Sequence, residues 1–310
     1  MKQKEWESKC ALIENGTGHT VRHIRTMHIN GNKTGGVSIL LPIVTLSDED
    51  EKEYTIKQLR MSQSRVEEYR TLCSMNLEGL QKIPYIIPCG VQNYLILSEW
   101  IQGETLEHII LRGDTSYKSL ASAAACRLRS VHQNMVVREH ITITDDDLRN
   151  LIFFDYLSKS TEQMLFEYMS HLLPYVNARN HSIVHGDMHV GNMLLTDDGK
   201  IVFIDLDDIT CGDPFLDMTY AANIIFNNRL QRFYHDFIIA YFDGKLPEHF
   251  WPVANFYSIA KAIIIIKHEL RSYQGKTLLS MERLIAEHKG LQQDEPEWFR
   301  AICKRQENNL

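Results

Sequence analysis

The first hundred residues alternate between apolar runs and polar turns, a pattern that predicts β-strands. Branched and aromatic side chains favour strands, and they are concentrated in the runs VRHIRTMHI (21–29), VSILLPIVTL (37–46) and YTIKQL (54–59). Because proline lacks an N–H, Pro42 predicts an edge strand or a bulge. Helical spacing appears instead in residues 64–80. The segment IIPCGVQNYLILSEWI (86–101) then predicts two more strands.

After Gly103 the pattern becomes mainly helical. Residues 120–133 predict a buried helix, and residues 145–176 predict a helical region whose acidic start suits a helix N-terminus. The segment NMLLTDDGKIVFID (192–205) reads as a hairpin with Asp-Asp-Gly-Lys at its turn, and helices follow from residue 214. The chain therefore predicts a β-rich N-terminal lobe, 1–100, and a helical C-terminal lobe, 101–310. Clefts between lobes are common ligand sites.

Charge and cysteine content narrow the classes of partner. A formal net charge of −7 disfavours nucleic acid and anionic membranes and favours a cationic small molecule. The six cysteines form no C-x-x-C pair, which indicates free thiols in a reducing compartment. The N-terminus has no apolar leader, and the block AIIII (262–266) is too short to cross a bilayer. We therefore expect a cytoplasmic protein with a small molecule as its partner. The expected assembly, a monomer or dimer, does not follow from these features.

The stretch HGDMHVGN (185–192) carries the first candidate chemistry. His185 and His189 are four residues apart and would share one face of a helix, as zinc ligands often do. However, Gly186 and Gly191 favour a loop, and no third nitrogen or sulfur ligand follows at a suitable spacing. A zinc site is therefore not the favoured interpretation.

The hairpin that follows favours phosphoryl transfer instead. Asn192 and Asp205 lie at opposite ends of the predicted hairpin, and strand pairing would bring those ends together. Mg²⁺ prefers carboxylate and amide oxygens together with phosphate oxygens and water. Asp187, just before the hairpin, could accept a proton from a hydroxyl group. A base and two metal ligands beside a nucleotide are what phosphoryl transfer requires.

The order H-G-D-x-H-x-x-N, then I-D, then GDPFLDM resembles the aminoglycoside phosphotransferase and choline kinase family, a relative of the protein kinases with their H-R-D-L-x-x-x-N. The resemblance implies a bilobal, protein-kinase-like α+β fold, with ATP or GTP and Mg²⁺ as cofactors. It implies that Asp187 is the catalytic base and that Asn192 and Asp205 bind the metal. Asp207 would be an additional metal residue or a support for one, although DLDD departs from the usual D-W-G or D-F-E.

The resemblance also implies roles for two further aspartates of the motif and for residues in the first half of the chain. Asp213 and Asp217 in GDPFLDM would be structural. Lys57 in YTIKQL would meet the nucleotide phosphates, held by Glu68, with Glu67 as the alternative. Backbone groups would cover the phosphates at Gly35, Gly36 and Ser38, with the turn at Gly16 and Gly18 as a second candidate, and would bind the purine at Ser98, Glu99 and Trp100.

The acceptor is the least determined part. Helical candidates at 227–244 and 260–274 contain Asp236, Asp243 and Glu269, which could meet ammonium groups of a substrate. The leading hypothesis is a kinase that acts on an aminoglycoside-type antibiotic. The alternatives are a metabolic kinase for choline, ethanolamine, homoserine or a sugar derivative, and a nucleotide-binding module without catalysis. A protein kinase is disfavoured because no A-P-E follows Asp205 and GDPFLDM leaves no room for an activation segment.

Overall fold

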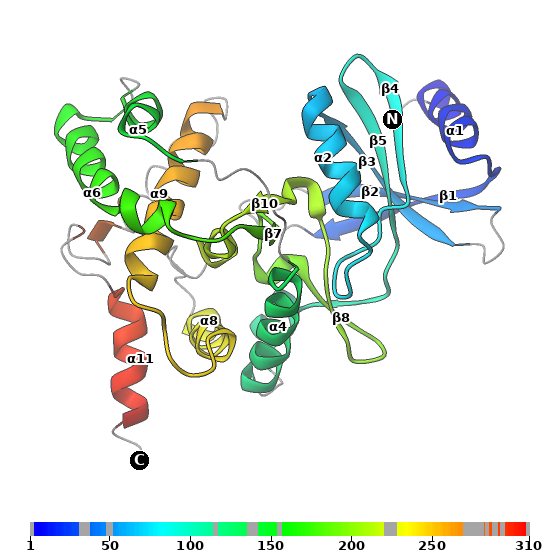
Figure 1. The fold of residues 1–310 in the computed structure, drawn as a ribbon. Coiled ribbons are helices and arrows are strands. Elements are labelled where there is room, and N and C mark those ends of the chain that lie inside the picture. Colours follow the sequence, from blue (N-terminus) through cyan, green and yellow to red (C-terminus); the bar gives the residue numbers. More distant parts are fainter. Residues whose placement is uncertain are drawn as a thin grey trace. The chain divides into compact units, whose positions relative to one another are not determined.

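The computed structural model describes residues 3–30, 38–47, 52–113, 117–134, 142–153, 157–219, 228–268 and 295–307, with a few positions between 282 and 291. The chain folds into two compact units (Figure 1). The N-terminal unit comprises Met1–Gly103 and Thr196–Thr210, and the C-terminal unit comprises Glu104–Leu195 and Cys211–Leu310. The segment Thr196–Thr210 lies within the predicted C-terminal lobe, 101–310. The structure packs this segment with the N-terminal unit, where the Phe203 N–H donates to the Gly79 carbonyl at 2.7 Å.

A five-stranded antiparallel sheet forms the N-terminal unit, in the order β1-β2-β3-β5-β4. The strands are β1 (Val21–Asn30), β2 (Ser38–Leu46), β3 (Glu53–Arg60), β4 (Tyr85–Gly90) and β5 (Asn93–Glu99). All five predicted strands are confirmed. Alternating side chains such as Val44, Leu46 and Tyr54 are buried in one core, as a half-buried sheet requires.

The edge position predicted from Pro42 is wrong, because β2 lies between β1 and β3. Pro42 pairs with Thr26 on β1, whereas β2 pairs with β3 only from Ile43 to Thr45. At Pro42, β2 is therefore paired with β1 but not with β3. The missing N–H of the proline interrupts no hydrogen bond to β3. The register shift in this pair lies on β1, between Val21 and His23, and not at the proline.

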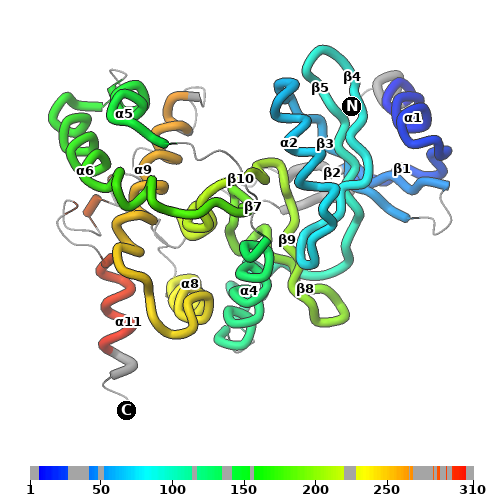
Figure 2. Tube along the Cα trace, in the orientation of Figure 1, coloured from blue at the N-terminus to red at the C-terminus, as the bar shows by residue number. Residues whose placement is uncertain are grey.

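Among the described residues, the N-terminal unit has two α-helices, which stand on either side of β4 and β5 in Figure 2. Helix α2 (Gln63–Ser74) begins after the N-cap Ser62 and ends earlier than the predicted residue 80. Asn76, with φ of 46°, turns the chain away there. Helix α1 (Gln3–Thr17) was not predicted from the sequence. It places Ile13 in the core of the sheet and packs against β4.

The C-terminal unit is mainly helical. The α-helices that the described residues form here are α3 (Leu106–Arg112), α4 (Tyr117–His132), α5 (Asp145–Ile152), α6 (Lys159–Asn177), α8 (Asn228–Tyr241), α9 (Phe250–His268) and α11 (Glu297–Glu307). The predicted helical region 145–176 is divided into α5 and α6, and α5 starts with a capping box between Thr144 and Asp147. A short sheet pairs β7 (Ser182–Val184) with β10 (Thr210–Gly212).

The predicted hairpin is formed by β8 (Met193–Thr196) and β9 (Ile201–Phe203). The Thr196 N–H donates to the Lys200 carbonyl at 2.9 Å, and the Gly199 N–H returns a bond of 2.9 Å to the Thr196 carbonyl. Asp205 follows β9 directly and precedes a short 3₁₀ turn, η2 (Leu206–Asp208). Within the described ranges, no helix combines the length and apolar character needed to cross a bilayer.

Candidate active site

Asp187 lies in a loop of the C-terminal unit between β7 and the 3₁₀ turn η1 (Val190–Asn192). The loop is held by the buried carboxylate of Asp217 on η3 (Pro214–Met218), which accepts the N–H groups of His185 and Gly186, each at 2.8 Å. His132 Nε2 lies 2.9 Å from Asp217 Oδ2. Burial acts to raise the pKa of Asp217, but the hydrogen bond and charge of His132 outweigh it and hold the pKa below its ordinary value. Asp217 is therefore a structural anchor of the loop.

Three side chains surround the carboxylate of Asp187. Lys261 Nζ on α9 lies 3.0 Å from Oδ1 and also donates to the Gly186 carbonyl at 2.8 Å. His189 Nε2 lies 3.7 Å from Oδ2. Asn192 donates through Nδ2 to the Asp187 carbonyl at 2.9 Å, and a carbonyl can only accept, so the amide orientation is assigned by this bond. The amide oxygen of Asn192 is thereby directed away from that carbonyl.

The two histidines of HGDMHVGN shape the loop. His185 Nδ1 accepts the Asp187 N–H at 3.3 Å, and His189 Nδ1 accepts the Gly191 N–H at 3.0 Å. A Cβ at position 191 would lie 2.7 Å from His189 Cε1, so only glycine allows this approach. Both imidazoles thus have a backbone partner within the loop.

The N-terminal unit brings Lys57, Asp205 and Asp207 together. Lys57 Nζ on β3 donates to Asp205 Oδ1 and, at 3.1 Å, to Asp207 Oδ2. Burial lowers the pKa of Lys57, but the two carboxylates outweigh it and hold the pKa above its ordinary value. Burial and the neighbouring Asp205 raise the pKa of Asp207, against the opposing effect of Lys57. The lysine therefore remains charged at neutral pH beside a pair of acids.

Asp205 has an unusual backbone conformation for a residue with a side chain, with φ of 65° and ψ of 61°. Its N–H donates to Gln81 Oε1 at 3.3 Å, and Gln81 Nε2 donates to the Glu99 carbonyl at 2.9 Å. Left-handed non-glycine residues concentrate at functional sites, where the surrounding structure compensates for their cost of about 1–3 kcal/mol. Gln81 supplies part of that compensation.

The structure places the two glutamates of α2 with other partners. Glu68 accepts from Arg65 Nη1 at 3.2 Å and from Thr210 Oγ1 at 2.9 Å. Glu67 accepts from Gln63 at 2.8 Å on the exposed face. The ion pair of Glu68 with Lys57, which the resemblance implies, stays a prediction.

The backbone groups assigned to the purine are partly used by the protein itself. The Glu99 N–H donates to the Lys82 carbonyl at 2.9 Å, and the Trp100 N–H donates to the Glu53 carbonyl at 2.7 Å. The Ser98 carbonyl accepts from Thr55 Oγ1 at 3.3 Å. A purine edge would compete with these bonds for the same N–H groups, so the assignment stays a prediction.

Of the two glycine turns predicted to cover the phosphates, the structure describes Gly16 and Gly18 but not Gly35 and Gly36. Gly35 and Gly36 lie outside the described residues, and Ser38 is described only by its backbone, which pairs with Asn30 at the start of β2. Gly16 lies within helix α1, whereas Gly18 follows its last residue with φ of 76° and donates its N–H to the Glu14 carbonyl at 2.9 Å. Gly18 therefore has a helix-terminating role.

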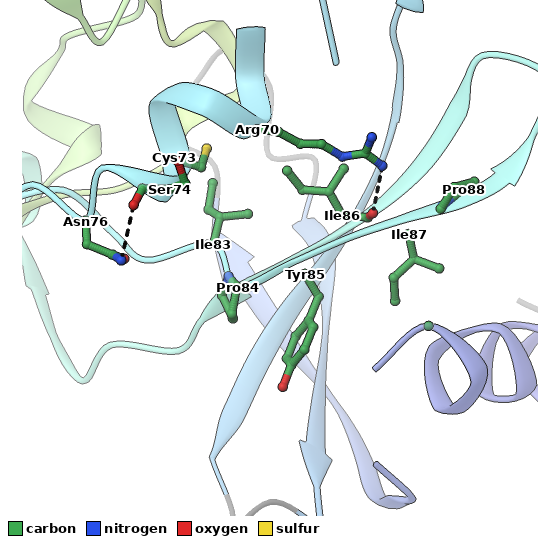
Figure 3. A pocket seen from close by; sticks show the side chains of 11 residues that line it. Arg70, Cys73, Ser74, Asn76, Ile83, Pro84, Tyr85, Ile86, Ile87 and Pro88 are labelled. Carbon is green, nitrogen blue, oxygen red and sulfur yellow. Dashed lines mark hydrogen bonds between the residues drawn. The ribbon is translucent and has the colours of Figure 1, made fainter. Parts of the chain in front are cut away.

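A hollow of about 580 Å³ lies elsewhere in the N-terminal unit, between the end of α2 and β4 (Figure 3). Arg70 borders it and donates to the Ile86 carbonyl at 3.4 Å. Burial raises the pKa of the Cys73 thiol to about 12, so this group stays protonated and unreactive. Of the residues predicted for the site, Gly16, from the second candidate for the phosphate turn, lines this hollow, and the others do not.

Sequence reasoning missed three residues that support the site. Lys261 contacts Asp187, Gln81 holds the backbone of Asp205, and the hydroxyl of Tyr234 accepts the Val190 N–H at 3.1 Å. Only Lys261 has a signal in the sequence. It is the first charged residue of α9, after eleven uncharged positions from Phe250 to Ala260.

Several solved structures have a similar fold. The gentamicin complex of APH(2")-IIa has a TM-score of 0.59 at 16% identity and covers 96% of this chain and 98% of that chain. Choline kinase LicA from Streptococcus pneumoniae has a TM-score of 0.58 at 14% identity and covers 91% and 98%. The ethanolamine kinase of Plasmodium vivax has a TM-score of 0.55 at 13% identity and covers 84% and 81%. The predicted protein-kinase-like α+β fold is confirmed.

The family follows from the sequence itself. The model of the APH phosphotransferase enzyme family matches residues 89–251, which is slightly more than half of the chain. No curated protein matches the sequence significantly. The chain belongs to the APH phosphotransferase family. It is therefore a small-molecule phosphotransferase, which confirms the predicted class of enzyme.

Proposed function

We propose that the chain transfers the γ-phosphate of ATP or GTP to a hydroxyl group of a small molecule, with Asp187 as the general base. The observation that carries this proposal is the held carboxylate of Asp187. Its loop is fixed through two backbone N–H groups, while its side chain keeps 27% exposure and can meet a hydroxyl group. A positioned carboxylate that accepts a proton is worth about 10²–10⁴ in rate.

We assign the nucleotide and metal to residues whose chemistry fits them. Lys57 would neutralise nucleotide phosphates, since its raised pKa keeps it charged at neutral pH. Asp205 and the amide oxygen of Asn192 would bind Mg²⁺, and Asp207 would be an additional ligand or a support. These are the oxygen donors that Mg²⁺ prefers. When bound, the ion neutralises charge on the phosphates.

For the acceptor, we propose an aminoglycoside-type antibiotic as the first class, which would make the chain a resistance enzyme. Similar folds include complexes with gentamicin, with streptomycin and ATP, and with GDP and kanamycin. Choline kinase LicA has nearly the same TM-score, so fold similarity does not separate aminoglycosides from choline, ethanolamine or other metabolic alcohols.

The acids expected to bind a cationic acceptor have partners of their own. Asp236 lies 2.9 Å from His235 Nδ1, and Asp243 lies 2.5 Å from Arg129. Glu269 lies outside the described residues. Recognition of a cationic acceptor by these three acids therefore stays a prediction, as does assembly as a monomer or dimer.

A coupled assay of ADP and GDP release tests the proposal. It would use Mg²⁺, a panel of aminoglycosides, amino-alcohols, homoserine and sugars, and the wild type beside Asp187→Ala. We expect turnover with one acceptor class and a loss of about 10²–10⁴ in the variant. Turnover that survives in Asp187→Ala would refute the role of the base.

Calorimetric titration of Mg-ATP separates the roles of the acids. Asp187→Ala should bind nucleotide nearly as well as the wild type, whereas Asp205→Ala should lose metal-dependent binding. Equal losses in both variants would contradict the assignment. Nucleotide binding without turnover on any acceptor would favour the non-catalytic module.

A further inference from the structure

Lys261 brings an ammonium group into direct contact with the catalytic carboxylate from a distant part of the chain. We infer that Lys261 is a positioning residue for phosphoryl transfer: it holds Asp187 Oδ1 so that Oδ2 receives the proton of the acceptor. This inference rests on the proposed role of Asp187 as base. Neither the motif HGDMHVGN nor the hairpin that follows contains this lysine.

Helix α9 holds Lys261 in a fixed place within the C-terminal unit. Tyr257 donates to Asp213 Oδ2 at 3.1 Å, and Ser258 Oγ lies 3.2 Å from the Thr219 carbonyl. Residues three and four apart lie on one face of a helix, so this face carries Tyr257, Ser258 and Lys261 together. The anchoring bonds at 257 and 258 are buried. They define where the next turn of α9 presents its lysine.

Two bonds then fix the orientation of the ammonium group. Lys261 Nζ donates to the Gly186 carbonyl at 2.8 Å and to Asp187 Oδ1 at 3.0 Å. The two acceptors belong to the neighbouring residues Gly186 and Asp187. The lysine therefore fixes the side-chain torsion of Asp187 relative to the backbone of the same loop. Asn192 Nδ2, at 3.4 Å, and His189 Nε2, at 3.7 Å, face Oδ2. The two carboxylate oxygens therefore have different environments, one cationic and one polar.

The solvent exposure of the two side chains predicts whether loss of this contact lowers turnover or folding stability. Lys261 and Asp187 have side-chain exposures of 25% and 27%. Ion pairs with access to water contribute little to folding stability. Orientation of a reacting group, by contrast, has a large effect on rate, since a misplacement of about 1 Å can cost about 10²-fold. Removal of the lysine should therefore lower turnover much more than stability.

Lys261→Met is the first variant to test, because methionine keeps the helix propensity and most of the apolar stem. Lys267→Met is its matched control. Lys267 lies on the same helix and also donates to a carbonyl, that of Asn150 at 2.6 Å. We expect kcat to fall about 10–100-fold in Lys261→Met, with KM for acceptor and nucleotide within about twofold. Lys261→Arg should recover part of kcat, and Lys267→Met should behave as the wild type.

The outcomes separate this inference from the proposed function. An unchanged kcat in Lys261→Met, while Asp187→Ala is inactive, overturns the role of Lys261 and leaves the base assigned. Turnover in Asp187→Ala overturns the proposed function itself. A loss in Lys261→Met that appears in KM alone, or that Lys261→Arg does not relieve while Tm falls, would show a structural or binding role and would also overturn the inference.

Discussion

At the scale of single residues, the geometry of the loop around Asp187 depends on the small size of a glycine as well as on charged groups. Gly191 leaves room for the His189 imidazole, which accepts the Gly191 N–H at 3.0 Å. Gly199, in the turn of the hairpin, has φ of 82° and no atom within 4 Å of a Cβ position. The first glycine is required by space and the second by backbone conformation.

This difference predicts that two alanine substitutions affect different properties, kcat in one case and stability in the other. Gly191→Ala should displace His189 and lower kcat roughly tenfold or more, because the Cβ would lie 2.7 Å from the ring. Gly199→Ala should cost about 1 kcal/mol of stability and leave kcat unchanged. Steady-state kinetics and thermal unfolding of both variants would check this. Equal kinetics in the two variants would refute the role of the loop geometry.

At the scale of elements, the packing of α1 on the sheet reverses an ordinary helix preference. Alanine within a helix is normally favoured over glycine by about 0.5–1 kcal/mol. At position 16, however, a Cβ would lie 2.6 Å from Ile87 on β4. We expect Gly16→Ala to destabilise the protein by about 1–2 kcal/mol, since overpacking costs more than the propensity gains.

Asn15→Ala is the control for that substitution, because Asn15 is exposed on the same helix and gains only in helix propensity. Chemical unfolding of both variants gives the comparison. A stabilised Gly16→Ala would mean that α1 does not pack against β4 as closely as the structure shows.

The elements also show what a sequence can predict. The strands and the motif around Asp187 were predictable because they depend on local periodicity and short spacing. Helix α1 was not, since it contains Gly16 and packs against β4, which lies about 70 residues later in the chain. The pairing of Lys261 with Asp187 spans 74 residues, and no local pattern encodes it. Likewise, Gln81 reaches Asp205 across 124 residues.

At the scale of the whole molecule, the buried acid Asp217 links stability to pH. The pKa of Asp217 is held below its ordinary value of 3.8 in the folded state, so its contribution is fully present above that pH. The contribution is lost as the pH falls through the lower, folded-state pKa. We expect Asp217→Asn to be destabilised on the order of 3 kcal/mol at neutral pH.

Thermal unfolding of the wild type and Asp217→Asn between neutral pH and about pH 3 would test this linkage. The difference in Tm should stay constant down to about pH 4 and shrink below it. A difference that stays the same at every pH would show that the charge of Asp217 does not contribute.

The membership of Thr196–Thr210 in the N-terminal unit has a consequence for dissecting the protein. Neither unit is encoded by one uninterrupted stretch of the gene. A fragment that ends at Gly103 would keep Lys57 but lack Asp205 and Asp207, the carboxylates that the lysine contacts. Exchanging N-terminal units between relatives to change nucleotide preference would therefore require two segments to be transplanted together. Because the segments of the two units alternate along the chain, no circular permutation makes either unit continuous.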